Sequence, residues 1–362
     1  MIKKKIIIAT GGTGGHIFPA YSLANNLEQD YDLILTTDNR GFQILKNYIN
    51  LNLKKIPSSP FIRKNIFTMI LSISIIVYSI IKSFLFLILN RPSIIIGVGG
   101  YSSFPICIAA FFLRIKFIIY ENNLIIGKAN KYLLPFAEKL FVSYKELDGI
   151  PKKYVHKIYE IGNIVRQEII NSDLYKVNSN FNEINVLVLG GSQAAKIFAD
   201  ELPQVFEKLK ETEFSIKVFQ QCQKKQNEQL SKFYGKAKIK FEIFNFTDKI
   251  IDYYSKSNLV ITRSGASVLG ELINVKIPFI SIPLPSSADN HQHKNAEFYA
   301  KKGYGYLLRE KDIKNKLFDL IKSIFQDKSQ LKGIINKQRQ YSDKDIFKTF
   351  NTQIKKIINE KN

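Results

Sequence analysis

The sequence predicts an α/β protein made of two Rossmann-like, doubly wound domains. Short runs of β-branched residues alternate with helix-length segments along the chain. These runs are almost continuously apolar, as expected for parallel strands that are covered on both faces. The pattern occurs twice, before and after a polar, Asn-rich stretch within residues 160–184. A chain of 362 residues is long enough for two such domains.

Each half of the chain contains six strand-like runs. In the first half we expect strands at 5–10, 31–37, 53–58, 93–99, 116–121 and 139–144. In the second half we expect them at 185–190, 215–220, 239–244, 258–263, 278–284 and 304–308. We predict an N-terminal domain at 1–165, a C-terminal domain at 166–340, and a last helix within 341–362 that packs back on the first domain. Since doubly wound sheets bind ligands beyond the carboxyl ends of their strands, we expect the domains to face each other across a cleft.

An apolar run between two predicted strands raises the question of a membrane span. It extends from Asn65 to Asn90, carries Lys82 as its only charge, and is long enough to cross a bilayer. We expect the strands that flank it to lie side by side in one parallel sheet, which a spanning helix would prevent. We therefore interpret the run as a crossover helix.

The polar residues of this run are spaced three or four apart and form one narrow stripe: Thr68, Ser72, Ser79, Lys82 and Ser83. More apolar surface remains than one sheet face can cover. The helix is therefore either an unusually apolar buried helix or a helix that rests on lipid, and we favour the second. Basic residues would then lie near anionic headgroups: Arg63, Lys64, Lys82 and Arg91.

The composition excludes several classes of protein. The net charge of +22 is compatible with an anionic partner, but residues 1–161 and the remainder carry equal net charge and no nucleic-acid-binding motif is present. We expect no nucleic-acid partner. Cys107 and Cys222 lie in apolar or amphipathic runs, so no disulfide framework is indicated. The apolar run near the N-terminus breaks at Gly11, which is too early for a signal peptide.

Four glycine-rich segments follow predicted strands, at 11–20, 97–105, 190–196 and 262–271. Glycines let a backbone approach a ligand, and the amides at a helix N-terminus attract anions, so phosphates are the expected ligands. The dinucleotide fingerprint G-x-G-x-x-G is absent, and only Asp38 lies near the usual position of a ribose ligand. His16 lies within the first segment, at the expected start of a helix, where the helix dipole favours a neutral imidazole that can accept a proton.

The motifs resemble those of the MurG-type N-acetylglucosaminyltransferases in order and approximate spacing, over nearly the whole chain. They are GGTGGHIFPA, GVGGYSSFP, YENNLIIGKANK, GNIVR, GGSQAAK, RSGASVLGE and DNHQHKNA. The resemblance implies an inverting glycosyltransferase of the two-Rossmann (GT-B) fold that acts in peptidoglycan synthesis. Its donor would be UDP-N-acetylglucosamine. The N-acetylglucosamine would be moved to the 4-hydroxyl of undecaprenyl-diphospho-N-acetylmuramoyl-pentapeptide. The resemblance also implies a peripheral protein at the cytoplasmic face of the bacterial inner membrane, with an anionic membrane surface as a further partner.

The resemblance assigns donor binding to Thr13, Gly14, Gly15, Asn123, Arg166, Ser192, Thr247, Ala266, Ser267, Val268, Leu269, Gly270, Glu271 and Gln292. It assigns the acceptor diphosphate to Gly99, Gly100 and Tyr101. Ser192 and the amides after Gly265 would hold the donor diphosphate, and Arg166 would neutralise it. Glu271 would accept the ribose hydroxyls. Backbone groups around Phe244 to Thr247 would hold the uracil.

The chain departs from the family pattern at four positions. Ala194 and Phe104 replace glycine, Ile164 replaces proline, and Asn122 replaces glutamine. Phe104 adds bulk beside the proposed acceptor loop.

His16 is our candidate for the base that takes the acceptor proton, and Glu121 is the competing candidate. We expect no metal or other cofactor, because neither D-x-D pair, Asp30/Asp32 or Asp343/Asp345, is placed to hold a metal ion beside a diphosphate. Two alternatives are another GT-B enzyme that uses a UDP-sugar, such as an epimerase or glycolipid synthase, and a basic surface-binding protein without catalysis.

Overall fold

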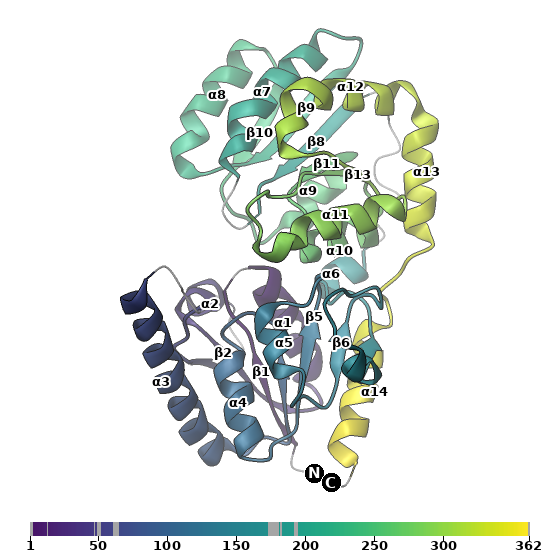
Figure 1. The fold of residues 1–362 in the computed structure, drawn as a ribbon. Coiled ribbons are helices and arrows are strands. Elements are labelled where there is room, and N and C mark those ends of the chain that lie inside the picture. Colours follow the sequence, from purple (N-terminus) through teal and green to yellow (C-terminus); the bar gives the residue numbers. More distant parts are fainter. Residues whose placement is uncertain are drawn as a thin grey trace. The chain divides into compact units, whose positions relative to one another are not determined.

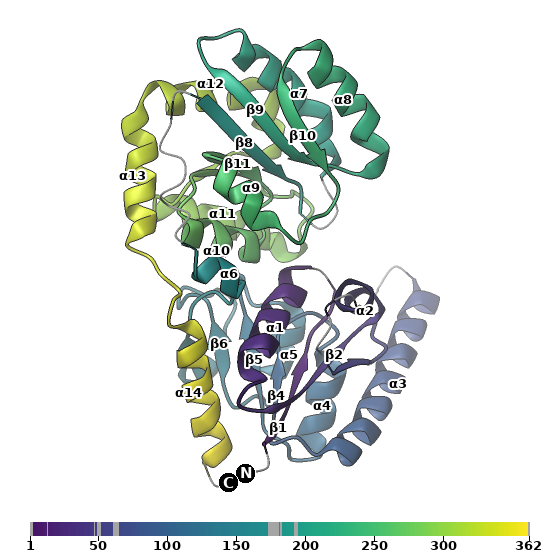
Figure 2. The same ribbon diagram turned by 180° about the vertical axis from the view of Figure 1, so that it is seen from behind.

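The computed structural model describes residues 3–12, 14–46, 48, 52–60, 65–172, 181, 183–191 and 195–360. The chain forms two compact units. The first contains Met1–Arg166 and Asp343–Asn362, and the second contains Gln167–Ser342. Each unit has one parallel sheet with helices on both faces (Figures 1 and 2), which confirms the predicted fold class.

The sheet of the first unit has seven strands in the order β3-β2-β1-β4-β5-β6-β7. Their bounds are β1 Lys5–Ala9, β2 Asp32–Thr37, β3 Leu53–Lys55, β4 Ile94–Gly97, β5 Phe117–Glu121, β6 Leu140–Val142 and β7 Ile158–Glu160. The six predicted strands are confirmed, and β7 is an additional edge strand. Our expectation that β3 and β4 lie side by side is wrong, because β2 and β1 lie between them. Both nevertheless belong to one parallel sheet, so the helix between them is a crossover connection.

Helices cover both faces of this sheet. They are α1 Gly14–Leu27, α2 Asn39–Leu45, α3 Ile66–Asn90, α4 Phe104–Phe112, α5 Lys128–Leu133 and α14 Ile346–Asn359, with a short 3-10 helix, η1, at Lys152–Lys157. α3, α4 and α5 contribute Leu87, Ile106 and Leu133 to the core on one face. α1 and α14 lie on the other face (Figure 2). There the Tyr31 hydroxyl donates to Asn351 at 3.0 Å, and the ring of Phe350 packs on that of Phe141.

The sheet of the second unit has six parallel strands in the order β10-β9-β8-β11-β12-β13. They are β8 Glu183–Leu189, β9 Ser215–Gln221, β10 Lys240–Phe244, β11 Leu259–Thr262, β12 Phe279–Ser281 and β13 Tyr306–Leu307, so the six predicted strands are confirmed. The helices are α6 Gln167–Ile170, α7 Lys196–Lys210, α8 Asn227–Lys236, α9 Ile250–Lys256, α10 Ala266–Val275, α11 His291–Lys301, α12 Ile313–Gln326 and α13 Lys328–Arg339.

The strand order places the glycine-rich segments. In the first unit the chain reverses its direction of winding between β1 and β4, and in the second between β8 and β11. Ligands of doubly wound sheets bind at such switch points, beyond the carboxyl ends of the strands. Within each unit, the two glycine-rich segments therefore follow neighbouring central strands.

The long helix α3 packs through its small polar residues. Asn65 caps its N-terminus, since Asn65 Oδ1 accepts the Thr68 amide at 2.8 Å. Ser72, Ser79 and Ser83 are buried, whereas Lys82 of the predicted stripe is exposed. The serine hydroxyls donate to backbone carbonyls one turn earlier in the helix, so their burial leaves no hydroxyl unpaired.

The opposite side of α3 is apolar and exposed. Eleven of its large hydrophobic residues are exposed, with Phe67 at 80% and Leu89 at 84%: Ile66, Phe67, Ile70, Leu71, Ile73, Val77, Tyr78, Ile81, Leu85, Ile88 and Leu89. Phe111 and Phe112 of α4 are exposed as well. α3 is long and apolar enough to cross a membrane by length and composition. We call this surface of α3 and α4 the apolar face.

Candidate active site

The imidazole of His16 lies at the switch point of the first unit. His16 is half-buried in the first turn of α1, and Thr10 Oγ1 donates to its carbonyl at 2.9 Å. The segment after β4 passes directly beside the ring, because a Cβ atom added to Gly99 would stand 2.7 Å from His16 Nδ1. Gly99 and Gly100 have φ values of +75° and +77°, a conformation that glycine adopts without strain. The structure therefore brings together His16, Gly99 and Gly100, as the sequence predicted.

Glu121 ends β5 and is buried, with 2% of its surface exposed. Its Oε1 accepts the Asn123 amide at 3.1 Å and the Asn123 side chain at 2.9 Å. Its Oε2 accepts the Gly127 amide at 2.9 Å and the Asn130 side chain at 3.0 Å. Four donors thus hold this carboxylate in place. This arrangement is typical of a residue that shapes a loop.

Asn122 connects the same loop to α1. Its Nδ2 donates to the carbonyl of Gly15 at 3.0 Å, and its Oδ1 accepts the side chain of Asn123 at 3.2 Å. Asn122 departs from the family pattern. It nevertheless forms hydrogen bonds with two predicted donor-binding residues, Gly15 and Asn123.

The GNIVR segment is fixed within the first unit. The amide of Asn163 donates to Asp343 at 3.0 Å, and its side chain donates to Tyr144 at 2.9 Å. Ile164 replaces a proline of the family pattern and uses the N–H that proline lacks, donating to the Tyr120 hydroxyl at 3.0 Å. Burial raises the pKa of Tyr120, so its hydroxyl stays protonated.

Arg166 follows this segment and is half-buried. Its guanidinium carbon lies 5.4 Å from the centre of the Phe18 ring, on α1. A cation over an aromatic face gains modest stabilisation. Arg166 is thus placed against the helix that begins with the predicted donor-binding residues.

In the second unit, α10 begins directly after the RSG segment. Gly265 caps it without a side-chain hydrogen bond. Ser264 is fully buried, and its hydroxyl has no hydrogen-bond partner within the described part of the chain. Asn295 Nδ2 donates to the Ser264 carbonyl at 3.1 Å and fixes the turn. The first amides of a helix have no partner within the helix, so this helix end suits a phosphate oxygen.

The cation beside this turn is engaged elsewhere. Arg263 is 8% exposed, pairs with Glu310, and donates to the carbonyls of Ile282 and Pro283 at 3.2 and 3.3 Å. Its guanidinium also lies over the Phe198 ring. Arg263 therefore holds the turn in position, a role that no sequence motif indicates.

The predicted donor-binding residues of α10 divide into two groups. Ala266, Leu269 and Gly270 are buried, so they can contribute only through the backbone, while Ser267 and Val268 are half-buried. Glu271 is 7% exposed, and its Oε2 accepts the Tyr254 hydroxyl at 2.8 Å. Tyr254 is a residue that sequence reasoning missed. It orients the carboxylate predicted to accept the ribose hydroxyls.

The remaining donor-binding residues lie in loops of the second unit. Gln292 Oε1 accepts the Leu284 amide at 2.9 Å, which directs the amide nitrogen of its side chain away from that contact. Thr247 Oγ1 accepts the Lys249 amide at 3.0 Å. Close to it, the Phe244 and Tyr253 rings stack with centroids 4.3 Å apart. Thr13, Ser192 and Ala194 lie outside the described residues.

Three further predicted features can be placed. Phe104 begins α4 and packs on the core of the first unit, so the core accommodates the volume of its side chain. Asp38, which lies near the ribose-ligand position of the dinucleotide fingerprint, is buried and caps α2. In the D-x-D pairs, Asp30 accepts a hydrogen bond from the Asn351 side chain, and Asp343 accepts one from the Asn163 backbone amide. Within the described ranges, no three His, Cys, Asp or Glu residues are grouped to hold a metal ion.

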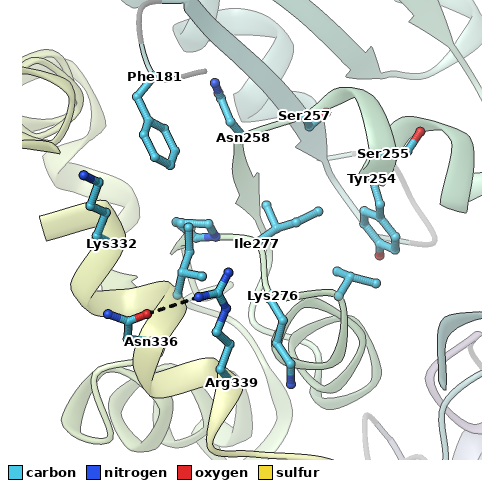
Figure 3. Close-up of a pocket in the computed structure, with 13 residues that line it drawn as sticks. Phe181, Tyr254, Ser255, Ser257, Asn258, Lys276, Ile277, Lys332, Asn336 and Arg339 are labelled. Atoms are coloured by element: carbon cyan, nitrogen blue, oxygen red, sulfur yellow. Dashed lines mark hydrogen bonds between the residues drawn. The ribbon is translucent and has the colours of Figure 1, made fainter. Parts of the chain in front are cut away.

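A cavity of about 440 Å³ lies elsewhere in the second unit (Figure 3). Its lining includes Asn258 and Pro278, which precede β11 and β12, so it is at the amino ends of these strands. The glycine-rich segments follow the opposite ends. In Figure 3, Arg339 donates to Asn336 at the edge of the cavity. The cavity thus lies at the strand ends opposite the glycine-rich segments, and it shares one residue with the candidate active site, because Tyr254 also lines it.

Comparisons with known proteins agree with this geometry. The glycosyltransferase family 28 N-terminal domain matches residues 6–142, and the family 28 C-terminal domain matches residues 185–350. A Pelagibacter ubique protein is 35% identical over 360 residues, covering 99% of this chain and 100% of the relative. A Rickettsia felis protein is 36% identical and covers 90% of this chain and 94% of the relative. Both are named UDP-N-acetylglucosamine–N-acetylmuramyl-(pentapeptide) pyrophosphoryl-undecaprenol N-acetylglucosamine transferase.

Solved structures share the fold. The Acinetobacter baumannii MurG structure superimposes with a TM-score of 0.78 at 22% identity, covering 98% of this chain and 99% of that one. A UDP complex of Staphylococcus aureus MnaA gives a TM-score of 0.67 at 16% identity, with 99% of both chains covered. At these identities the likeness shows the fold alone.

Proposed function

Because the chain belongs to glycosyltransferase family 28, and within it to the MurG-type transferases, we propose that it makes the lipid-linked disaccharide of peptidoglycan synthesis. It transfers N-acetylglucosamine from UDP-N-acetylglucosamine to the 4-hydroxyl of undecaprenyl-diphospho-N-acetylmuramoyl-pentapeptide. The observation that carries this proposal is the 35% identity to a relative of that name over 99% of the chain. An epimerase or another UDP-sugar enzyme would share the fold, but not an identity of this extent with transferases.

The residues of the second unit support a role in donor binding. The amides at the start of α10 suit the diphosphate. Glu271, oriented by Tyr254, accepts the ribose hydroxyls. Gln292 turns its amide nitrogen toward sugar oxygens. Backbone groups between Phe244 and Thr247 take the uracil, and Ser192 adds a further diphosphate contact, although it lies outside the described residues.

The first unit supplies the groups for the acceptor and the leaving group. Gly99, Gly100 and Tyr101 bind the acceptor diphosphate, and Gly14 and Gly15 expose backbone amides at the start of α1. Asn123 hydrogen-bonds the sugar. Arg166 neutralises the charge that develops on the departing UDP. Thr13 is assigned to the donor by resemblance and lies outside the described residues.

The transfer itself inverts the anomeric carbon. The acceptor 4-hydroxyl oxygen attacks C1 of N-acetylglucosamine, the bond from C1 to the UDP oxygen breaks, and UDP leaves with the electron pair. We assign His16 as the base that accepts the hydroxyl proton, because its ring lies beside the acceptor loop at Gly99. Glu121 is the weaker candidate, since four donors already occupy its oxygens.

The protein is membrane-associated and peripheral, and we assign its membrane contact to the apolar face. A lipid-linked substrate requires the enzyme to work at the surface of the bilayer, and exposed apolar patches of this size mark interaction sites. Lys82 is exposed within the apolar face, and Arg91 follows α3. Such cations favour the anionic lipids of the cytoplasmic leaflet.

An assay with a short-chain lipid-linked muramoyl-pentapeptide tests this function. Release of UDP from UDP-N-acetylglucosamine must depend on the acceptor and must persist in a chelator. An epimerase would alter the sugar nucleotide without the acceptor, and a non-catalytic binding protein would release nothing. Either of these results would overturn the proposal.

A further inference from the structure

Asp38 is a buried carboxylate to which the proposed reaction gives no part. It follows β2, caps α2 and is 4% exposed. No cationic side chain forms an ion pair with it within the described part of the chain, so hydrogen bonds alone offset the cost of burying its charge. The partners that provide these bonds show what Asp38 does.

Four donors, one from α2 and three from two loops, converge on this carboxylate. Its Oδ1 accepts the Gly41 amide of its own helix at 2.8 Å. Its Oδ2 accepts the Gly12 amide at 3.1 Å, from the loop between β1 and α1. The same oxygen accepts the Tyr101 hydroxyl at 3.0 Å and the Ser102 hydroxyl at 3.2 Å, from the loop between β4 and α4.

The two loops that Asp38 joins are in close contact. A Cβ on Gly11 would stand 2.2 Å from Ser102 Oγ and 3.0 Å from Asp38 Cγ. A Cβ on Gly100 would stand 2.8 Å from the carbonyl oxygen of Gly11. Only glycines allow this approach, and small shifts of either loop would break it. The loop between β1 and α1 leads to His16. Gly99 to Tyr101 belong to the loop between β4 and α4.

We propose that Asp38 is a positioning residue for the sugar transfer. It ties the loop that leads to His16 to the loop that binds the acceptor diphosphate, and so fixes the base against the acceptor. This inference rests on the proposed function. A ribose-binding role for Asp38 does not fit, because it is buried and its two oxygens already take four hydrogen bonds.

The chemistry at this position requires a carboxylate. An ionised carboxylate only accepts hydrogen bonds, which matches four donors. In Asp38→Asn, one oxygen becomes an NH₂ group that faces donors. When the remaining oxygen caps α2 by accepting the Gly41 N–H, as an Asn N-cap does, the NH₂ group faces the donors of Oδ2. The Tyr101 and Ser102 hydroxyls can rotate to accept from it, whereas the Gly12 N–H cannot. The loop between β1 and α1 is then released while the volume of the side chain is unchanged.

The test compares Asp38→Asn with a matched control, Asp30→Asn. Asp30 is a carboxylate of the same unit that accepts the Asn351 side chain, remote from both loops. We expect Asp38→Asn to lower kcat about 10- to 100-fold and to raise the acceptor KM, as misplacement by about 1 Å does. Asp30→Asn should match the parent in kcat and in the acceptor KM. Amide exchange should accelerate at Gly12.

A double variant separates positioning from a general loss of stability. If Ser102 acts through Asp38, Ser102→Ala lowers kcat in the parent but adds little to Asp38→Asn. Independent effects that multiply would overturn the inference, as would a kcat of Asp38→Asn within twofold of the parent. If Asp38→Asn does not fold, Ser102→Ala decides alone, and an unchanged kcat there overturns the inference. A parent without acceptor-dependent UDP release would instead contradict the proposed function.

Discussion

The imidazole of His16 and the backbone of Gly99 are in contact, with no room for a side chain between them. A Cβ on Gly99 would stand 2.7 Å from His16 Nδ1 and 2.9 Å from Cε1, and the φ of Gly99 is +75°. The candidate base and the acceptor loop therefore constrain each other. Any residue larger than glycine must displace the ring or the loop.

Gly99→Ala should lower kcat about 10- to 100-fold through this displacement, with a smaller effect on folding. Gly235→Ala is the matched control, because a Cβ on Gly235 meets nothing within 4 Å. We expect the control to keep full activity and to gain slight stability. Steady-state kinetics and thermal melting of both variants check this. Full activity in Gly99→Ala would show that the contact does not matter for transfer.

His16→Ala should lower kcat about 10²- to 10⁴-fold and leave the fold intact, as expected on losing a general base. Glu121→Ala should instead lower the free energy of unfolding by about 2–4 kcal/mol, because it leaves buried donors unpaired. Glu121→Gln keeps one acceptor oxygen and should retain most of the activity. Near-normal turnover in His16→Ala, together with inactive but folded Glu121 variants, would reverse the assignment of the base.

Glu271→Gln should raise the KM for UDP-N-acetylglucosamine about 10- to 100-fold, the usual effect of losing hydrogen bonds to a charged group. Tyr254→Phe should raise it only about 3- to 10-fold, because the carboxylate remains but is less well oriented. Tyr306→Phe is the control, since it also removes one hydroxyl bond, to Gln330 at 3.0 Å, in the same unit. Equal KM values for Tyr254→Phe and Tyr306→Phe would mean that Tyr254 does not orient Glu271.

The strands and the glycine-rich segments were predictable because their signals are local. Runs such as Ile94–Gly97 are buried on both faces, and their continuous apolar sequence predicts this burial. β7 was missed because it is short and mostly exposed. The order of the strands was not predictable in the same way. Residues within a strand do not say which neighbour it pairs with, and so β3 and β4 were wrongly placed together.

Parts of the site depend on contacts between distant residues, which the sequence does not display. Glu121 is the weaker candidate for the base because of its four hydrogen-bond donors, and the sequence does not show that they converge on it. Tyr120 supports Ile164 across 44 residues of chain. The side of α3 that packs on the core was also not evident from the sequence, because a stripe of serines usually indicates the side that faces solvent. Here the small serines allow close packing, and the large apolar side chains remain outside.

Tyr101 supplies a prediction about alkaline stability. Burial, together with the adjacent Asp38 carboxylate, raises the pKa of Tyr101 to about 12. The folded state therefore holds this proton more tightly than the unfolded state, and the stability linked to it declines as the pH rises from about 10 to 12. The stability advantage of the parent over Tyr101→Phe should shrink across this range. Urea unfolding of both proteins at several pH values measures it, and a constant difference would contradict the raised pKa.

Charge on the apolar face should abolish membrane binding without unfolding the protein. Leu85 is 58% exposed on α3, so Leu85→Glu adds a charge on the outer side of the helix. Ile76 and Phe84 are half-buried and would be poorer choices. We expect at least about tenfold weaker binding to vesicles that contain anionic lipid, because a carboxylate enters the lipid interface only at a cost. Activity on a short-chain soluble acceptor should not change.

Two control variants complete this experiment. Val155 is 54% exposed on η1, beside the far edge strand β7, and Val155→Glu should bind vesicles as the parent does. Ser79 is fully buried on the inner side of α3, and Ser79→Leu should destabilise the fold by about 1–3 kcal/mol through overpacking. If Leu85→Glu unfolds the protein and Ser79→Leu does not, the inner and outer sides of α3 are reversed. If folded Leu85→Glu binds vesicles like the parent, the apolar face is not the membrane contact.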